Sequence, residues 1–155
     1  MRLAISPYPY PRNDYMTAQS AVRRLSVLVV DDNRDAADTL VLFLRLSGHD
    51  ARVAYTGAQA LAALRDWRPD VAVLDIVMQD VDGVDLAARM RAEADQSILL
   101  LAVTGVGTND EVARVKAGTF DHIFLKPVNP DDLLRLLTSH SDRPIAPDRS
   151  TDGTT

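Results

Sequence analysis

The chain has 155 residues, a formal net charge of −5, 46% hydrophobic residues and no cysteine. This composition fits a single domain with a substantial core, excludes disulfides and cysteine-ligated zinc, and lacks the long basic stretch of a nucleic-acid surface. No apolar run approaches the ~20 residues that span a bilayer, and the apolar stretch after Arg2 is too short for a signal peptide, so we expect a cytoplasmic protein without membrane insertion.

The two ends of the chain differ in composition from the middle. Residues 1–24 include the run from Ser6 to Pro11, in which prolines alternate with serine and tyrosine and disfavour helix. We expect a flexible N-terminal extension, with a docking segment for a partner protein as the alternative. Residues 139–155 are polar and contain prolines, which predicts a disordered C-terminal tail. The expected domain therefore covers residues 25–138.

Between these ends, short apolar runs alternate with amphipathic segments. The apolar runs predict five strands, near residues 26–30, 50–54, 71–75, 97–103 and 121–125. The segments after them predict five helices, near residues 34–47, 57–66, 84–94, 110–117 and 130–138. This alternation predicts a doubly wound α/β fold, with a five-stranded parallel sheet and helices on both faces. For a chain of this length we expect the flavodoxin-like strand order 2-1-3-4-5.

Capping signals mark the ends of these helices. Thr56 and Gln59 form a capping-box pattern, and Gly48 and Gly118 suit the left-handed residue that ends a helix. Trp67 is expected just past the second helix, as a packing residue. Side chains suited to N-caps precede three other helices: Asn33, Asn109 and Asn129.

Acidic residues follow two of the predicted strands. Asp31 and Asp32 come directly after the first strand, and Asp75 ends the third. A lone aspartate after a strand usually only turns or caps the chain. Two strands that both end on aspartate instead favour a shared role for these residues. In the expected order these strands are neighbours, so the three carboxylates meet at the edge where open α/β sheets bind ligands. A hard cation would relieve their repulsion, and oxygen donors without histidine or cysteine favour Mg²⁺.

The next two strands end on residues that complement such a cluster. Thr104 supplies a hydroxyl, and Lys126 supplies a cation that can pair with an anionic oxygen. The peptide bond between Lys126 and Pro127 can be cis at modest cost. Together these residues indicate a phosphoryl-transfer site, in which one aspartate is the nucleophile and the threonine and lysine hold the transferred group.

In order and spacing, these motifs resemble the receiver domain of bacterial two-component response regulators, over about residues 26–138. Five segments carry the resemblance: Val29–Asp32, Leu74–Ile76, Asp82–Gly83, Val103–Gly105 and Leu125–Pro127. The resemblance implies that Asp75 accepts a phosphoryl group from a phosphohistidine on a sensor histidine kinase. It also implies that Thr104 follows this group and that Lys126 pairs with it.

The resemblance further implies a Mg²⁺ site. Asp32 would be a direct ligand, and Asp31 would act largely through water. Asp75 and the backbone carbonyl of Val77, two residues beyond it, would complete the protein ligands.

Two positions depart from the usual pattern of these receivers. Gln79 stands where the family often has proline, and we expect it to loosen the loop without touching the chemistry. The switch aromatic of the family usually lies three residues before the lysine, where this chain has Ile123. Phe124 follows it and His122 precedes it, and His122 is expected at the surface or edge. The sequence therefore leaves open whether phosphorylation changes the conformation of the far face of the domain.

The resulting hypothesis is a stand-alone, phosphorylation-switched receiver without a DNA-binding output domain. It would not be an enzyme beyond its own phosphorylation and slow autodephosphorylation. Its partners would be a sensor histidine kinase or a histidine phosphotransfer protein, and an unidentified downstream protein. Receivers often pair through the fourth helix, fifth strand and fifth helix, so the resemblance implies that a homodimer could form through this face.

Other functions remain open at this point. The segments Asp121–His122 and Lys126–Val128 resemble receivers attached to hybrid histidine kinases, so the chain could equally be an excised or solitary relay domain that passes phosphate to a histidine-containing protein. It could also be an interaction module that no longer depends on phosphate. A phosphatase of the haloacid dehalogenase type also uses Mg²⁺ and a nucleophilic aspartate, but it needs a second acid where this chain has Val77. A flavin-binding flavodoxin would need a phosphate loop where this chain has Asp31 and Asp32.

Overall fold

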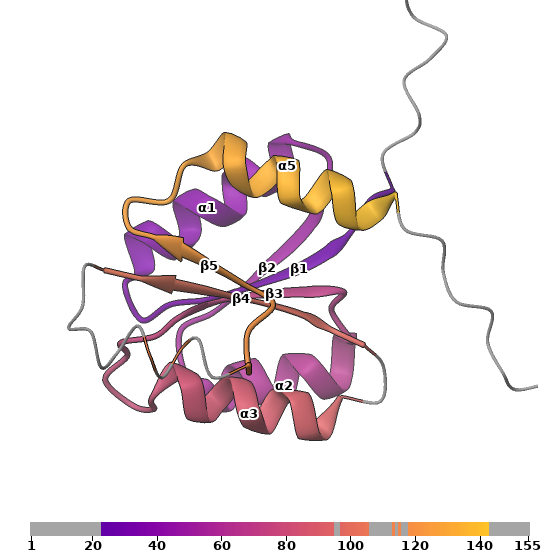
Figure 1. The fold of residues 1–155 in the computed structure, drawn as a ribbon. Coiled ribbons are helices and arrows are strands. Elements are labelled where there is room, and N and C mark those ends of the chain that lie inside the picture. The colour runs from indigo at the N-terminus through magenta and orange to yellow at the C-terminus, as the bar shows by residue number, and fades with distance from the viewer. Residues whose placement is uncertain (1–22, 95–96, 106–112, 114, 116–117, 143–155) are drawn as a thin grey trace, which may run out of the picture.

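The sheet and its two helical layers follow the predicted topology. The computed structural model describes residues 23–94, 97–105, 113, 115 and 118–142 (Figure 1). The strands are β1 (Ser26–Val30), β2 (Asp50–Ala54), β3 (Val71–Asp75), β4 (Leu99–Thr104) and β5 (His122–Leu125). They form one parallel sheet in the order β2-β1-β3-β4-β5, which confirms the predicted fold class and strand order.

Four helices are described: α1 (Arg34–Leu46), α2 (Gly57–Trp67), α3 (Gly83–Glu93) and α5 (Pro130–Ser141). The first and last cover one face of the sheet, and the other two cover the opposite face (Figure 1). The predicted helix between β4 and β5, with its Asn109 cap, lies mostly outside the described residues, so only β5 and α5 of the expected dimer face are described. No helix among the described residues is long and apolar enough to cross a membrane.

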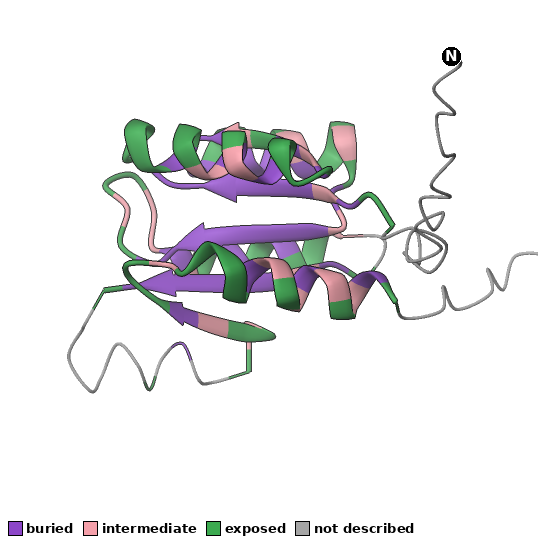
Figure 2. Ribbon diagram, turned by 90° about the horizontal axis from the view of Figure 1, so that it is seen from above, coloured by how far each residue is buried: buried purple, intermediate pink, exposed green. Residues whose placement is uncertain are grey.

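The sheet separates two apolar cores because successive side chains of a strand point to opposite faces. In β1, Val27 and Val29 pack on the side of α1 and α5, whereas Leu28 and Val30 pack on the side of α2 and α3. All five residues of β3 are buried. Figure 2 shows the central strands buried and the helices exposed along their outer sides. This central burial fixes β3, and with it the position of Asp75.

Most predicted helix caps are confirmed. Asn33 caps α1, Thr56 caps α2 and Asn129 caps α5, each through its side-chain oxygen. The positive φ values of Gly48 (95°) and Gly118 (94°) are the left-handed conformations expected there.

Two predicted helix ends need correction. Trp67 is the last residue of α2 rather than a residue beyond it, because Arg68 takes the left-handed φ of 52° that ends the helix. Helix α5 continues to Ser141, so residues 139–141 belong to the fold and not to a tail that starts at 139. Ser141 is buried, and its hydroxyl donates to the carbonyl oxygen of Thr138 at 2.7 Å. Packing of this last turn extends the helix beyond its apolar pattern.

Candidate functional site

The carboxyl edge of the sheet brings the three predicted acids together. Because β1 and β3 are parallel neighbours with Val30 opposite Leu74, the residues that follow each strand meet at one edge. Asp31, Asp32 and Asp75 each place one carboxylate oxygen within 4.8 Å of the others. The topology therefore produces the acidic cluster expected from the strand ends.

Asp31 and Asp75 are largely withdrawn from solvent, with exposed fractions of 9% and 6%. Burial raises the pKa of the Asp31 carboxyl above its ordinary value of 3.8, and the charges of Asp75 and Asp32 raise it further. The backbone N–H of Asn33, which donates to Asp31 Oδ1 at 2.9 Å, and the nearby Lys126 lower it in part. Negative charge is therefore costly here, which is the electrostatic setting of a cation site.

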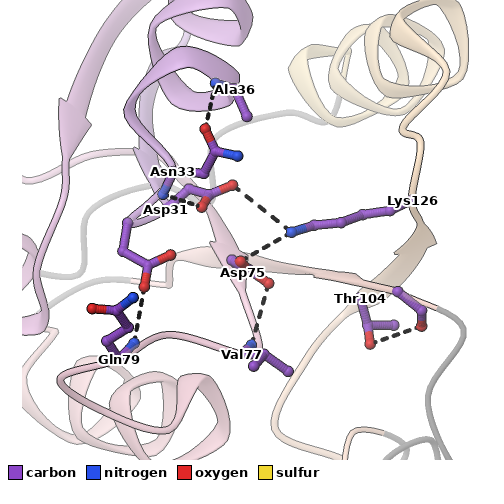
Figure 3. A network of polar contacts seen from close by, with 10 residues as sticks. Asp31, Asn33, Ala36, Asp75, Val77, Gln79, Thr104 and Lys126 are labelled. Carbon is purple, nitrogen blue, oxygen red and sulfur yellow. Dashed lines mark hydrogen bonds and ion pairs between the residues drawn. The ribbon is translucent and has the colours of Figure 1, made fainter.

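Lys126 supplies a cation inside the cluster. Its Nζ lies 3.0 Å from Asp75 Oδ2 and 4.0 Å from Asp31 Oδ2, so it bridges the ends of β1 and β3 (Figure 3). The backbone N–H of Lys126 donates to the carbonyl oxygen of Thr104 at 2.8 Å, which ties this residue to the end of β4. The Lys126–Pro127 peptide bond is cis. The predicted lysine thus reaches the predicted nucleophile directly.

The second oxygen of Asp75 is held by its own loop. The backbone N–H of Val77 donates to Asp75 Oδ1 at 3.2 Å. The N–H of Gly83 donates to the carbonyl oxygen of Ile76 at 2.9 Å, which folds the loop back onto the strand end. A Cβ at Gly83 would lie 2.4 Å from the carbonyl oxygen of Asp75, so only glycine permits this approach. These contacts fix the direction of the Asp75 carboxylate.

Thr104 occupies the predicted place but faces its own backbone. It is buried, and its hydroxyl donates to the carbonyl oxygen of Gly105 at 3.2 Å. In Figure 3 its side chain lies apart from the ion pair of Lys126 and Asp75. The hydroxyl must therefore rotate or move to reach a group on Asp75.

The position of the usual switch aromatic is filled by packing residues. Ile123 is half-buried, and Phe124 beside it is buried in the core under α1 and α5. His122 is exposed at the edge of the sheet, as expected, with its ring centroid 4.7 Å from that of Phe124. The prediction that no aromatic stands ready at position 123 agrees with this arrangement.

The sequence reasoning missed the role of the loop after β3. The backbone N–H of Gln79 donates to Asp32 Oδ2 at 2.9 Å, and Asp80 Oδ2 accepts from the N–H of Gly57 at 2.8 Å. Gln79 was expected to loosen the loop without touching the chemistry; its backbone contacts one of the three acids, and its effect on the chemistry stays a prediction. These bonds join residues far apart in the chain, and the local sequence offers no signal for them.

The cluster borders a groove of about 870 Å³ between the start of α1 and the β5–α5 connection. Asp31, Asp75 and Lys126 line one part of it, and Leu40 and Phe43 line another. Asp75 therefore lies at the margin of this groove.

The donor set fits a hard divalent cation. It consists of carboxylate oxygens at the edge of the sheet, with the pKa of Asp31 raised by burial and by the charges of Asp75 and Asp32. Mg²⁺ prefers one or two such carboxylates together with waters and phosphate oxygens. Val77, whose carbonyl was expected as a further ligand, lies in the adjacent loop and is linked to Asp82 by an isolated β-bridge.

Comparison with known protein families and sequences agrees with the site. The profile of the response regulator receiver domain matches residues 27–138. The DNA-binding response regulator MtrA of Mycobacterium tuberculosis is 36% identical over 111 residues, which cover 72% of this chain and 48% of that protein. The probable transcriptional regulatory protein TcrX of the same organism is 34% identical over 110 residues, which cover 71% and 47%. The chain thus spans about half the length of the curated relatives it matches.

Solved structures show the same architecture. A response regulator receiver protein from Pseudomonas putida superposes with a TM-score of 0.70 at 31% identity, covering 76% of this chain and 98% of that one. A CheY-like receiver domain protein from Methanospirillum hungatei superposes with a TM-score of 0.71 at 25% identity, covering 77% and 95%. Both similarities extend over most of the described residues.

Proposed function

Since the chain belongs to the response regulator receiver domain family, we propose that Asp75 is its phosphoacceptor. The observation that carries this proposal is the contact of Lys126 Nζ with Asp75 Oδ2 at 3.0 Å, at the centre of the acidic cluster. Asp75 ends the central strand, lies in contact with a cation and borders an open groove. Members of this family are signalling receivers rather than classical enzymes.

The proposed reaction is a phosphoryl transfer from a phosphohistidine to the Asp75 carboxylate. One oxygen of Asp75 donates an electron pair to phosphorus and forms the new P–O bond. The P–N bond to the imidazole breaks, and the leaving nitrogen keeps its electron pair and takes up a proton. Lys126 holds the reacting carboxylate in place and pairs with the anionic oxygens of the transferred group. Thr104 would donate its hydroxyl to these oxygens after turning away from Gly105.

We propose that Asp31, Asp32 and Asp75, with the backbone carbonyl of Val77, hold Mg²⁺. When bound, Mg²⁺ neutralises the negative charge that the acids and the phosphoryl group bring together. The residues of the chain keep the cluster assembled before binding, since Lys126 and the N–H groups of Asn33 and Val77 offset part of the repulsion. The raised pKa of Asp31 means that cation binding competes with a proton at this carboxyl.

Membership of the family implies a histidine kinase as partner. We propose that the phosphoryl group comes from such a kinase or from a histidine phosphotransfer protein, and that a downstream protein recognises the phosphorylated domain. The proposed receiver comprises residues 25–138 together with the last turn of α5. The names of the curated relatives describe DNA-binding regulators, and the proposal for this chain concerns only the receiver activity.

A receiver-like module that binds its partner independently of phosphate is the second candidate. Ile123 at the switch position favours it, because Phe124 beside it is committed to the core and no aromatic stands at position 123 to follow Thr104. The ion pair between Lys126 and Asp75 favours the phosphoacceptor.

Intact-mass measurement after incubation with acetyl phosphate separates the two candidates. The parent chain should gain one phosphoryl group in the presence of Mg²⁺ and lose this gain in EDTA. Asp75→Asn should gain none, whereas Asp66→Asn, on the exposed face of α2, should behave as the parent. Because some receivers accept only from a protein donor, the same measurement is made with a phosphorylated histidine phosphotransfer protein. No mass gain from either donor would favour the phosphate-independent module.

A further inference from the structure

The outer side of α1 carries an exposed apolar row. Leu42 and Leu46 are 58% and 79% exposed and lie one helical turn apart. Among the described residues, no other two exposed large apolar side chains share one element. Asp35 and Asp38, which are also exposed, lie on the same side at helical spacing, nearer the start of the helix. We call these four residues the outer α1 face, which has an acidic half and an apolar half.

The two arginines of α1 are held on the side of β2. The guanidinium of Arg34 lies over the ring of Tyr55, 4.1 Å from its centroid. Arg45 Nε donates to the carbonyl oxygen of Ala51 at 2.8 Å. The Tyr55 hydroxyl donates to Asp38 at 2.5 Å, which fixes the direction of this carboxylate. The outer α1 face therefore suits a segment that offers apolar side chains together with positive charge.

The chain enters the domain beside the end of α1. The backbone N–H of Leu25, directly before β1, donates to Nδ1 of His49 at 3.3 Å. His49 lies three residues beyond Leu46, and its own N–H donates to the carbonyl oxygen of Leu44 at 3.0 Å. Residues 1–22 thus join the fold next to the apolar half of the outer α1 face.

Residues 1–22 lie outside the described part of the chain, and their sequence complements this face. They contain three of the four tyrosines of the chain, together with two branched apolar residues: Tyr8, Tyr10, Tyr15, Leu3 and Ile5. Prolines alternate with the first two tyrosines, and proline-rich segments lose little conformational entropy on binding. Arg2 and Arg12 outnumber the single acid, Asp14. At about 3.1 Å per residue, an extended segment of this length spans about 70 Å, whereas α1 is about 20 Å long.

We propose that residues 1–22 bind back along the outer α1 face of the same chain and cover Leu42 and Leu46. Burial of the leucines against tyrosine and proline side chains supplies the apolar part of the contact. The arginines of the segment complement the acidic half of the face. The first turns of α1 line the groove beside Asp75, so the bound segment borders this groove. In the proposed function, on which this consequence rests, the segment competes with a protein donor that contacts α1 and slows phosphoryl transfer.

The absence of cysteine permits a site-specific test on the full chain. A nitroxide is attached to Ser6→Cys, and the amide signals of the isotope-labelled chain are compared by NMR before and after reduction of the nitroxide. The amides of Leu42 and Leu46 should lose intensity before reduction, whereas those of Ala58 and Arg89, on the helices of the opposite face, should not. An isotope-labelled chain without nitroxide, mixed with an unlabelled chain that carries it, should show no such loss. Loss in this mixture would assign the contact to a second copy and overturn the proposal.

Substitutions on both sides of the contact identify its residues. Tyr8→Ser with Tyr10→Ser should restore the intensities on α1, as should Leu42→Ser with Leu46→Ser. Leu125→Ser replaces a leucine of β5 that is 59% exposed, and as the matched control it should leave the loss unchanged. No loss in the parent chain, or a loss that persists in both double variants, would overturn the inference.

Phosphorylation rates test the consequence for signalling. Tyr8→Ser with Tyr10→Ser should accept faster than the parent from a phosphorylated histidine phosphotransfer protein. Both chains should react at the same rate with acetyl phosphate, which is too small to contact the outer α1 face while it reacts. Equal rates from the protein donor would overturn this consequence. A parent chain that accepts from neither donor would instead overturn the proposed function.

Discussion

Replacing Asp31 with asparagine should stabilise the metal-free domain, although it removes a residue of the proposed site. The pKa of Asp31 is raised by burial and by the charges of Asp75 and Asp32, so its ionised form costs free energy in the folded state. Asparagine keeps an oxygen that can accept from the N–H of Asn33, as Asp31 Oδ1 does at 2.9 Å. The turn after β1 should therefore survive the substitution.

The size of the effect follows from the distances. The carboxylate oxygens of the cluster lie within 4.8 Å of one another, and two unit charges at that limit repel by about 3 kcal/mol at an effective dielectric constant of about 20; Asp31 has two such neighbours. Lys126, at 4.0 Å from Asp31, offsets about one of these interactions, but its side chain is 40% exposed and screened. About one repulsion of about 3 kcal/mol and the cost of burying the charge then remain, and solvent screening and the N–H of Asn33 reduce them, so we expect a gain of about 1 to 2 kcal/mol, or about 5 to 10 °C in Tm.

Urea and thermal unfolding in EDTA at neutral pH measure this gain, with Asp66→Asn as a control for the change in net charge. Because the folded pKa is raised, the penalty is absent below the ordinary value of 3.8 and grows as the pH rises through the folded pKa. The difference between variant and parent should therefore vanish in acid. Added Mg²⁺ should stabilise the parent more than the variant. An Asp31→Asn chain less stable than the parent in EDTA at neutral pH would refute the reasoning.

Other substitutions test different parts of the same account. Burial lowers the pKa of His49, whose Nδ1 accepts a backbone N–H at 3.3 Å just before β1. The contribution of neutral His49 to stability is therefore complete above the ordinary pKa of 6.5 and is lost as the pH falls through the folded pKa. The free energy of unfolding should fall by at most about 1.4 kcal/mol per pH unit in this range. His49→Gln should flatten this pH dependence in urea unfolding. Gly83→Ala should destabilise by about 1 to 3 kcal/mol, since its Cβ would meet the carbonyl oxygen of Asp75, whereas Gly105→Ala, with open space around its Cβ, should be neutral in the same assay. Lys126→Ala should lower stability in EDTA by about 1 kcal/mol and leave a folded chain that Mg²⁺ restabilises; an unchanged unfolding midpoint in EDTA would contradict the contact of Lys126 with the acids.

The strand order and the acidic cluster could be predicted because both follow from local patterns. Short apolar runs alternating with amphipathic segments predict a parallel sheet, and right-handed crossovers leave few strand orders open. Once β1 and β3 are neighbours, the acids that follow them must meet. Lys126 was placed by the same logic, since it follows the strand at the edge of the sheet.

Helix ends were less predictable because they depend on tertiary packing. Trp67 has no special sequence signal, and α2 includes it because Arg68 adopts a left-handed conformation that is unusual for a residue with a side chain. The polar residues at the end of α5 indicated a tail, yet Ser141 is buried against the fold. Composition alone does not show which polar residues have partners.

The position of the loop after β3 was predicted, but its conformation was not. Its conformation depends on bonds from Gln79 to Asp32 and from Asp80 to Gly57, which join residues 47 and 23 positions apart. No periodicity or capping rule connects such positions. The resemblance to receivers predicts only that Gln79, where the family often has proline, loosens the loop, and it gives no indication of these bonds.

The most direct test of the central claim is to locate the phosphoryl group on the chain. After incubation with a phosphoryl donor and Mg²⁺, borohydride reduces an aspartyl phosphate to homoserine, and peptide sequencing by mass spectrometry identifies the position. The account predicts homoserine at position 75 in the parent chain, with none when Mg²⁺ is withheld. Homoserine at position 31 or 32, or phosphate on a residue outside the cluster, would contradict it.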